Sequence, residues 1–545
     1  MRYFNTLMKQ LAQASDMEGP VRKTIADILG LIKKQKELRF FVDGTRNLGH
    51  QAATVHIMKR LIDMTEFNGC VRIIYADAAP DASFTTGDKF GILLAGVDPR
   101  DLDATAIEYG TCRDVRFLSF QRRQALLDEV LFGFTGGADD MTLNFSAELK
   151  VKSFIRLQPY LWDDEKYSKA DVYYESSRVE SPDGKYFYPV DEYPEFRKFP
   201  YKFAKKGINT VGARIWAWYG SEQTFDEGLR IRTNNVQTLY RACQRDPGLL
   251  VWPIYGLHHF EDHVPEMAMN LVCSAFLAQQ TIDKPIVALF LNAPETIPQL
   301  SLYLLPFARD LTEKNYDLHY FKSALAAVYD PVLDPSLSGA NLDRFVAKIA
   351  AQVRPWIDAG SRLTVLTDYN AKTGGWVDIS EALGAAIASS TGNETIVALV
   401  GPIPIDIFNY FYATCGIPGV FEGQSSSSLV LSLGQPFLQI PRHDGAIQNR
   451  YPSLLIGGNY EHSAAIANDA ALPLRDQQYK SYLRRENPTE PDRYFAELAK
   501  TSSFIVAVQD SSSDMKAYFD ALGNFFQNDI HDKLLLGLVA QALSS

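Results

Sequence analysis

Four consecutive serines stand between two apolar runs in residues 420–441, whose sequence is VFEGQSSSSLVLSLGQPFLQIP. We expect 420–423 to form a strand and 427–434 to form the helix after it, so that the serines fill the turn. The first N–H groups of a helix lack partners within the helix and lie at its positive end. Small hydroxyl residues there would let a diphosphate approach closely. The alternative interpretation is a serine-rich helix cap without a ligand.

A second polar loop follows an earlier apolar strand. Residues 38–44 read as that strand, and a helical pattern runs from about His50 to residue 64. Histidine has the side chain whose ordinary pKa lies nearest neutrality, so His50 is our candidate for the base that takes a proton from an attacking group. Asp43 is an alternative base or an orienting carboxylate. The structural alternatives are a surface histidine at a helix start and an aspartate that caps a strand end.

Composition restricts the class of protein. The chain has 545 residues, of which 46 % are hydrophobic and 22 % charged, which predicts two or more globular domains. The net charge of −11 argues against nonspecific binding of nucleic acid.

The 5 cysteines are widely spaced and form no C-x-x-C pair, as expected of reduced thiols in a cytoplasmic protein. We find no apolar stretch of the roughly 20 residues that a membrane span needs, and no classical signal peptide, although export without one stays open.

Strands and helices alternate in two successive sets. Strand-like runs lie at residues 38–44, 71–77, 90–96, 115–120, 129–136, 151–159, 286–292, 363–369, 395–401, 418–423 and 436–441. This pattern predicts an α/β protein with two Rossmann-like domains that face a cleft, because ligands of open parallel sheets bind beyond the carboxyl ends of the strands. The expected divisions are N-terminal helices at 1–37, an acceptor domain at 38–275 with an inserted lobe at about 163–210, a donor-binding domain at 276–512 and C-terminal helices at 513–545.

Two segments resemble a known family. Residues 402–436 resemble a P-Q-D-x-[YF] helix, a strand, and an R-G-E-D-S turn that leads to A-G-x-P; residues 42–61 resemble a V-D-N-x-G-D-I-G opening. These are motifs of the bacterial arginine rhamnosyltransferases that modify elongation factor P, which belong to the GT-B glycosyltransferases. Together the segments cover about a tenth of the chain. Asn47 stands where the family has its second aspartate, and Gln424 where it has the glutamate of R-G-E-D-S, with Glu422 two places earlier.

The resemblance implies an inverting, metal-independent glycosyltransferase without a cofactor. Its substrate would be a UDP- or dTDP-sugar, and a protein is one class of acceptor. The catalytic candidates are His50, Asp43 and Asn47; the donor-binding candidates are Gly401, Asp406, Glu422, Gln424, Ser425, Ser426, Ser427, Ser428, Arg442 and Asp444.

Several of these residues have alternative roles. In the donor half, residues 401–406 would hold the nucleobase, Arg442 a phosphate and Asp444 sugar hydroxyls. Asp406 could instead cap a helix and Arg442 could form a surface ion pair, while Asp368 ends another strand that could line the cleft. The departures at Asn47 and Gln424 also leave two other functions open: a sugar-nucleotide epimerase or hydrolase on the same scaffold, and a catalytically inactive GT-B-like binding protein.

Overall fold

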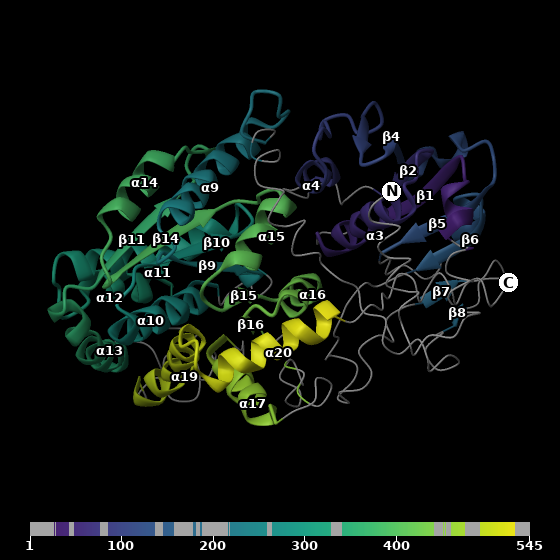
Figure 1. Ribbon diagram of the computed structural model, residues 1–545. Coiled ribbons are helices and arrows are strands. Elements are labelled where there is room, and N and C mark those ends of the chain that lie inside the picture. Colours follow the sequence, from purple (N-terminus) through teal and green to yellow (C-terminus); the bar gives the residue numbers. More distant parts are fainter. Residues whose placement is uncertain are drawn as a thin grey trace.

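The computed structural model is of mixed α/β architecture and contains two large, mainly parallel sheets (Figure 1). It describes residues 27, 29–42, 48–76, 85–136, 145–156, 178–180, 186–187, 216, 219–258, 264–328, 340–440, 451, 453, 459–474 and 491–528.

Sheet A has the strand order β3-β4-β2-β1-β5-β6-β7-β8. Its strands are β1 (Glu37–Val42), β2 (Cys70–Tyr75), β3 (Ala106–Tyr109), β4 (Cys112–Ser119), β5 (Val130–Thr135), β6 (Val151–Arg156), β7 (Arg178–Glu180) and β8 (Tyr186–Phe187). The strands from β4 to β6 are parallel, and β3, β7 and β8 join as antiparallel edges. Among the parallel strands, the chain turns back between β1 and β5, as in doubly wound nucleotide-binding sheets. The helices of this half are α3 (Gly49–Thr65), α4 (Thr86–Leu93) and α5 (Phe145–Glu148).

Sheet B is parallel throughout and has the order β11-β14-β10-β9-β15-β16. Its strands are β9 (Leu250–Tyr255), β10 (Ile286–Leu291), β11 (Arg362–Thr367), β14 (Glu394–Val400), β15 (Gly419–Phe421) and β16 (Phe437–Gln439), and a small hairpin, β12 (Tyr369–Asn370) and β13 (Gly375–Trp376), follows β11. Every residue of β10 is buried, as expected of a central strand covered on both faces. The chain turns back between β9 and β15.

Helices cover both faces of sheet B (Figure 1). They are α9 (Glu227–Arg245), α10 (Val264–Ile282), α11 (Thr296–Thr312), α12 (His319–Val328), α13 (Ala340–Asp358), α14 (Ser380–Ser389), α15 (Ile405–Thr414), α16 (Gln424–Leu433), α17 (Glu461–Ala470), α19 (Pro491–Gln509) and α20 (Asp514–Asn528). Alternate residues of β10 point into two different cores, with Phe290 on the face of α10 and α11 and Leu291 on the face of α9 and α14. The last described helix, α20, packs against α16.

Several elements differ from the sequence predictions or add to them. Residues 90–96 lie in and after helix α4, not in a strand; Thr85 and Asp88 form a capping box that starts this helix. The strand β9 was not predicted, and because it belongs to sheet B, this sheet begins before residue 276. Within the expected lobe at 163–210, the described residues are β7 and β8, which extend sheet A. In the described part of the chain, no helix combines the length and apolar character of a membrane span.

Candidate functional site

Sheet B reverses its strand order between β9 and β15. Ligands of open parallel sheets bind beyond the carboxyl ends of the strands at such a switch point. Gly256 follows β9 with a φ of 94°, and a methyl group added to it would lie 2.7 Å from the Cβ of Glu422, which follows β15. Glu422 is almost fully buried. The two strand ends therefore pack tightly side by side and direct the N-terminus of α16 toward this edge.

Helix α16 begins three residues earlier than predicted. Gly423 is its N-cap, in extended conformation, and among the described residues no side chain caps the helix. The serines are thus part of the helix itself, and the predicted serine cap is wrong in this respect. The N–H group of Ser427 bonds the carbonyl of Gly423 at 3.2 Å. Three N–H groups, those of Gln424, Ser425 and Ser426, precede that first helical bond and face the helix end.

The serine hydroxyl groups differ in their surroundings. Ser427 is fully buried, and its Oγ has no hydrogen-bond partner within the described residues. Ser426 is 8 % exposed. For Gln424, Ser425 and Ser428, the structure describes the backbone only. Within the described residues, an uncapped helix terminus and a buried hydroxyl without a partner therefore lie next to each other on α16.

Gly401 lies in a buried charged network and not at the switch point. Its N–H donates to Asp368, at 3.1 Å from Oδ1 and 3.3 Å from Oδ2, so this group is already used within the protein. Trp376 lies directly over Gly401, since an added methyl group would be 2.2 Å from the ring. The guanidinium of Arg232 stacks 3.9 Å from the centroid of the Trp376 ring and donates from Nε to the carbonyl of Pro402 at 2.7 Å.

Asp368 has the most perturbed carboxyl group of this network. Burial raises its pKa to about 7, and the charge of Arg232 and the N–H of Gly401 only partly oppose that effect. Asp226 lies 3.6 Å from the Nη2 of Arg232, while Nη1 has no hydrogen-bond partner in the described region. The network fixes the β12–β13 hairpin over the end of β14.

Asp406 contacts the other half of the molecule. It lies in the first turn of α15, whose N-cap is Pro404, so its predicted alternative role as the cap is not observed. Its Oδ2 is 3.9 Å from the Nζ of Lys59 on α3. In the described structure this side chain therefore forms a long ion pair between the two halves.

Of the predicted catalytic loop, the structure describes only the end that starts α3, next to the switch point of sheet A. His50 is in the first turn of α3, where only its backbone is described, and Asp43 and Asn47 lie outside the described residues, as do Arg442 and Asp444. On the neighbouring strand, Gly136 follows β5, and its N–H donates to the Oγ1 of Thr54 on α3 at 2.8 Å. The described backbone thus brings the start of α3 and the end of β5 together.

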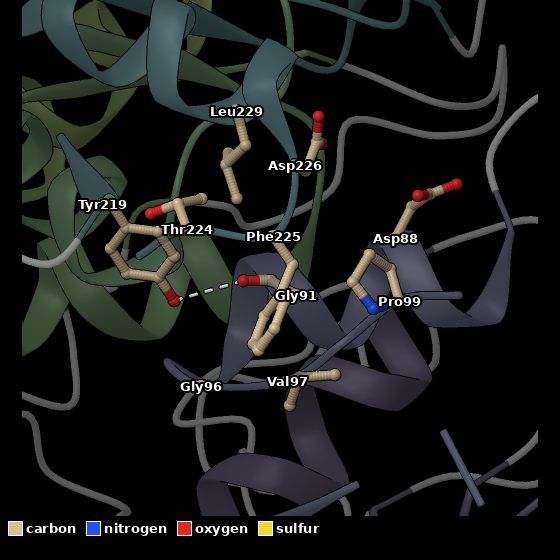
Figure 2. Close-up of a pocket in the computed structure, with 10 residues that line it drawn as sticks. All are labelled: Asp88, Gly91, Gly96, Val97, Pro99, Tyr219, Thr224, Phe225, Asp226 and Leu229. Carbon is tan, nitrogen blue, oxygen red and sulfur yellow. Dashed lines mark hydrogen bonds between the residues drawn. The ribbon is translucent and has the colours of Figure 1, made fainter. Parts of the chain in front are cut away.

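Two hollows lie elsewhere, along the α4 side of sheet A. Figure 2 shows the first, where Asp88 and Pro99 face Phe225 and Asp226, and Tyr219 donates to the carbonyl of Gly91 at 3.1 Å. Its volume of about 10 Å³ is close to that of one water molecule. The second has a volume of about 440 Å³, lies at the carboxyl end of β2, and is lined by Tyr75, Thr85, Thr86, Gly87, Asp88, Pro99, Arg100 and Leu102. Only the second has the size of a ligand pocket.

Two other groups at the carboxyl edge of sheet B were not among the predicted site residues. His258 follows β9 at the switch point, with its ring 5.3 Å from that of Tyr255, and it was not among the predicted site residues because β9 was not predicted. Arg232 and Trp376 had no local signal, because residues far apart in sequence build their network. Within the described residues, no cluster of His, Cys, Asp and Glu has the arrangement of a metal site.

Comparisons with protein-family models, curated proteins and solved structures give no match.

Proposed function

We propose that this protein is a glycosyltransferase that moves a sugar from a UDP- or dTDP-sugar to an acceptor, with inversion at the sugar. In this proposal the two sheets belong to two Rossmann-like domains that face a cleft, as in GT-B enzymes. The observation that carries the proposal is the open N-terminus of α16 at the switch point of sheet B. Metal is not required, because the helix end supplies the positive potential that the diphosphate needs.

The diphosphate would bind the N–H groups of Gln424, Ser425 and Ser426. A methyl group added to Gly423 would have no described atom within 4 Å, which leaves room for a phosphate to approach the backbone. The nucleobase would lie toward β14, as the resemblance implies, although Gly401 would support that site through Asp368 and not through a free N–H group. Arg442 and Asp444 would hold phosphate and sugar on the side of β16.

The acceptor would bind on the side of the cleft that sheet A forms. His50 would remove the proton of the acceptor group as that group forms its bond to the anomeric carbon, with Asp43 as the orienting carboxylate or the alternative base. The bond from the anomeric carbon to the diphosphate oxygen breaks in the same step, and the nucleoside diphosphate leaves with the electron pair. The end of α16 would stabilise its negative charge. The hollow of about 440 Å³ at the end of β2 is a candidate acceptor subsite, and a protein side chain is one class of acceptor.

Donor binding is tested by calorimetric titration with a panel of UDP- and dTDP-hexoses. We expect the double variant Ser425→Asp, Ser426→Asp to bind the best donor at least about tenfold more weakly, because it sets carboxylates against a diphosphate. The matched control, Ser425→Ala with Ser426→Ala, removes the hydroxyls without adding charge and should bind within about threefold of the parent, since the N–H groups remain. Unchanged binding by the Asp variant would place the diphosphate elsewhere.

Turnover is tested with radiolabelled donor in the presence and absence of a protein extract as the source of acceptors. The His50→Ala variant should retain the parent's donor affinity and lose most transfer. Release of free sugar at the same rate without extract would instead identify a hydrolase, and isomerised donor an epimerase. Donor binding with no product in either condition would identify an inactive binding protein and reject the transferase.

A further inference from the structure

The hollow of about 440 Å³ lies at the carboxyl edge of sheet A, beside the end of β1. Tyr75, which lines it, ends β2 and pairs in register with Val42, the last residue of β1. Neighbouring strands are about 4.8 Å apart, so a ligand in this hollow would lie next to the strand that leads to α3. Asp88 and Pro99 line both this hollow and the smaller one at the junction with the other half (Figure 2).

The floor of the hollow is preformed and largely apolar. A methyl group added to Gly87 would lie 2.0 Å from the carbonyl oxygen of Pro99, so the first turn of α4 and the loop after this helix are in direct contact. Leu102 and Tyr75 are both nearly buried. The hydroxyl of Tyr75 donates to the Oδ1 of Asp103 at 3.1 Å, which holds its ring in place. A bound molecule would therefore meet a fixed apolar surface.

Asp88 lines the hollow with a carboxylate that is only partly used. Its Oδ2 accepts the N–H and the hydroxyl of Thr85 at 2.9 Å and 2.7 Å, in the capping box of α4. Within the described residues, its Oδ1 accepts no hydrogen bond. The positive end of α4 and the guanidinium of Arg232 both compensate the charge of this carboxylate. Asp88 thus retains an acceptor atom whose charge is already balanced.

Arg100 lines the same hollow with a guanidinium that is also only partly used. Its Nε and Nη2 donate to the two carboxylate oxygens of Asp98, each at 2.9 Å. This bidentate pair balances the positive charge. In the part of the chain that the structure describes, Nη1 makes no hydrogen bond, and the side chain is 72 % exposed. Arg100 thus retains donor groups without a net charge to offer.

These two residues restrict the chemistry of a ligand. An ion of either sign would gain no unbalanced counter-charge here, and it would meet a like charge on Asp88 or on Arg100. A hydroxyl group both donates and accepts, so a ligand with several hydroxyls can bond both residues. A serine or threonine side chain has one hydroxyl and would fill little of the hollow. A sugar ring has several, and its C–H groups can lie on the apolar floor.

We propose that this hollow binds an uncharged sugar ring, so that the acceptor of the transferase is a carbohydrate. The role as acceptor rests on the proposed function, whereas the sugar-binding site does not. One hydroxyl of the ring donates to the Oδ1 of Asp88, and another accepts from the Nη1 of Arg100. Neither residue takes part in bond making or breaking, because both only position the ring.

The test is a titration of the full chain, followed by ligand-observed NMR. The probes are methyl glycosides of neutral hexoses, those of glucuronic acid and glucosamine as charged counterparts, and N-acetylserine amide as a protein-like probe. We expect the neutral glycosides to bind best. Arg100→Met and Asp88→Asn should each weaken the best of them about threefold to tenfold. The control Arg113→Met removes an exposed guanidinium that pairs with Glu108 outside the hollow, and it should bind as the parent does.

Arg100→Met changes an exposed side chain and should keep the parent's unfolding midpoint and its affinity for nucleotide sugars. If the parent binds nucleotide sugars but no neutral glycoside, the function stands and the carbohydrate acceptor is rejected. Tighter binding of the serine probe or of a charged glycoside would also reject it, as would equal glycoside affinity in the parent and in Arg100→Met. Glycoside binding that Arg100→Met weakens, in a protein that binds no nucleotide sugar, would support the site and reject the function.

Discussion

Asp368 is a carboxyl group that burial keeps protonated close to neutral pH. It accepts the N–H of Gly401 at the end of β14, while Arg232, the nearby cation, stacks on Trp376. Burial raises the pKa of Asp368 from 3.8 to about 7. Since the folded protein holds this proton to a higher pH than the unfolded chain does, the group's contribution to stability is fully present below about pH 4 and is lost as the pH rises through 7.

The Asp368→Asn variant should remove this part of the pH dependence. An amide still accepts from Gly401, but it does not titrate. Between pH 5 and pH 8, the parent's free energy of unfolding should fall by about 2–3 kcal/mol relative to that of the variant. Urea unfolding at the two pH values measures the difference. Equal changes in the two proteins would show that Asp368 ionises in the folded state as it does in the unfolded one.

Helix α16 begins and ends at glycines with different surroundings. Gly423, at its start, has a φ of −84° and open space in the described structure where a side chain would be. Gly434, at its end, has a φ of 64°, and an added methyl group would lie 2.6 Å from the carbonyl oxygen of Phe519 and 2.8 Å from the Cα of Gly523. The first glycine leaves room for a ligand, and the second permits close packing of α20.

The variants Gly423→Ala and Gly434→Ala should therefore have different effects. Gly434→Ala should lower the free energy of unfolding by about 2 kcal/mol or more, because the left-handed conformation and the backbone contact both disfavour a side chain. Gly423→Ala should cost about 1 kcal/mol or less, yet weaken donor binding several-fold through steric contact with the diphosphate. Chemical denaturation and calorimetry on both variants test this. A Gly423→Ala protein with the parent's donor affinity would contradict diphosphate binding at this helix end.

The sequence predicted most central strands, because continuous apolar runs such as that of β10 are typical of buried parallel strands. The sequence analysis missed β9. Pro253 lies within this strand, and a proline has no backbone N–H to donate, which argues against a central strand. In the structure, Pro253 nevertheless pairs in register with Leu289 of β10. The start of α16 was also placed too late, since serines are common just before helices. The contacts of Asp368 and Lys59 join distant segments, so no local pattern could predict them.

At the scale of the whole molecule, two described polar contacts join helices α3 and α4 to the second half. Tyr219 donates to the carbonyl of Gly91 on α4, and Lys59 on α3 faces Asp406 on α15. A small buried cluster of Ile92, Tyr219 and Leu229 accompanies them (Figure 2 shows Tyr219 and Leu229). Polar and apolar contacts therefore both contribute to the junction between the halves.

The two polar contacts should differ in strength. Tyr219→Phe leaves a buried carbonyl without its donor and should cost about 1 kcal/mol, with faster hydrogen exchange in α4. Asp406→Asn removes a partly exposed ion pair at 3.9 Å and should cost less than about 0.5 kcal/mol. Denaturation and hydrogen-exchange measurements on the two variants compare them. A larger cost for Asp406→Asn would show that the ion pair dominates the junction.

The contact between Gly434 and Gly523 also bears on synthesis of the protein. A chain leaves the ribosome from its N-terminus, and its domains begin to fold in that order. Sheet B is complete once residue 439 has emerged, but α16 gains its packing against α20 only after residue 523 has followed. A nascent chain between these two points would have its strands in place and the helix end proposed to hold the diphosphate still unsupported. Donor binding, as proposed here, would then have to wait until the segment that forms α20 has been synthesised.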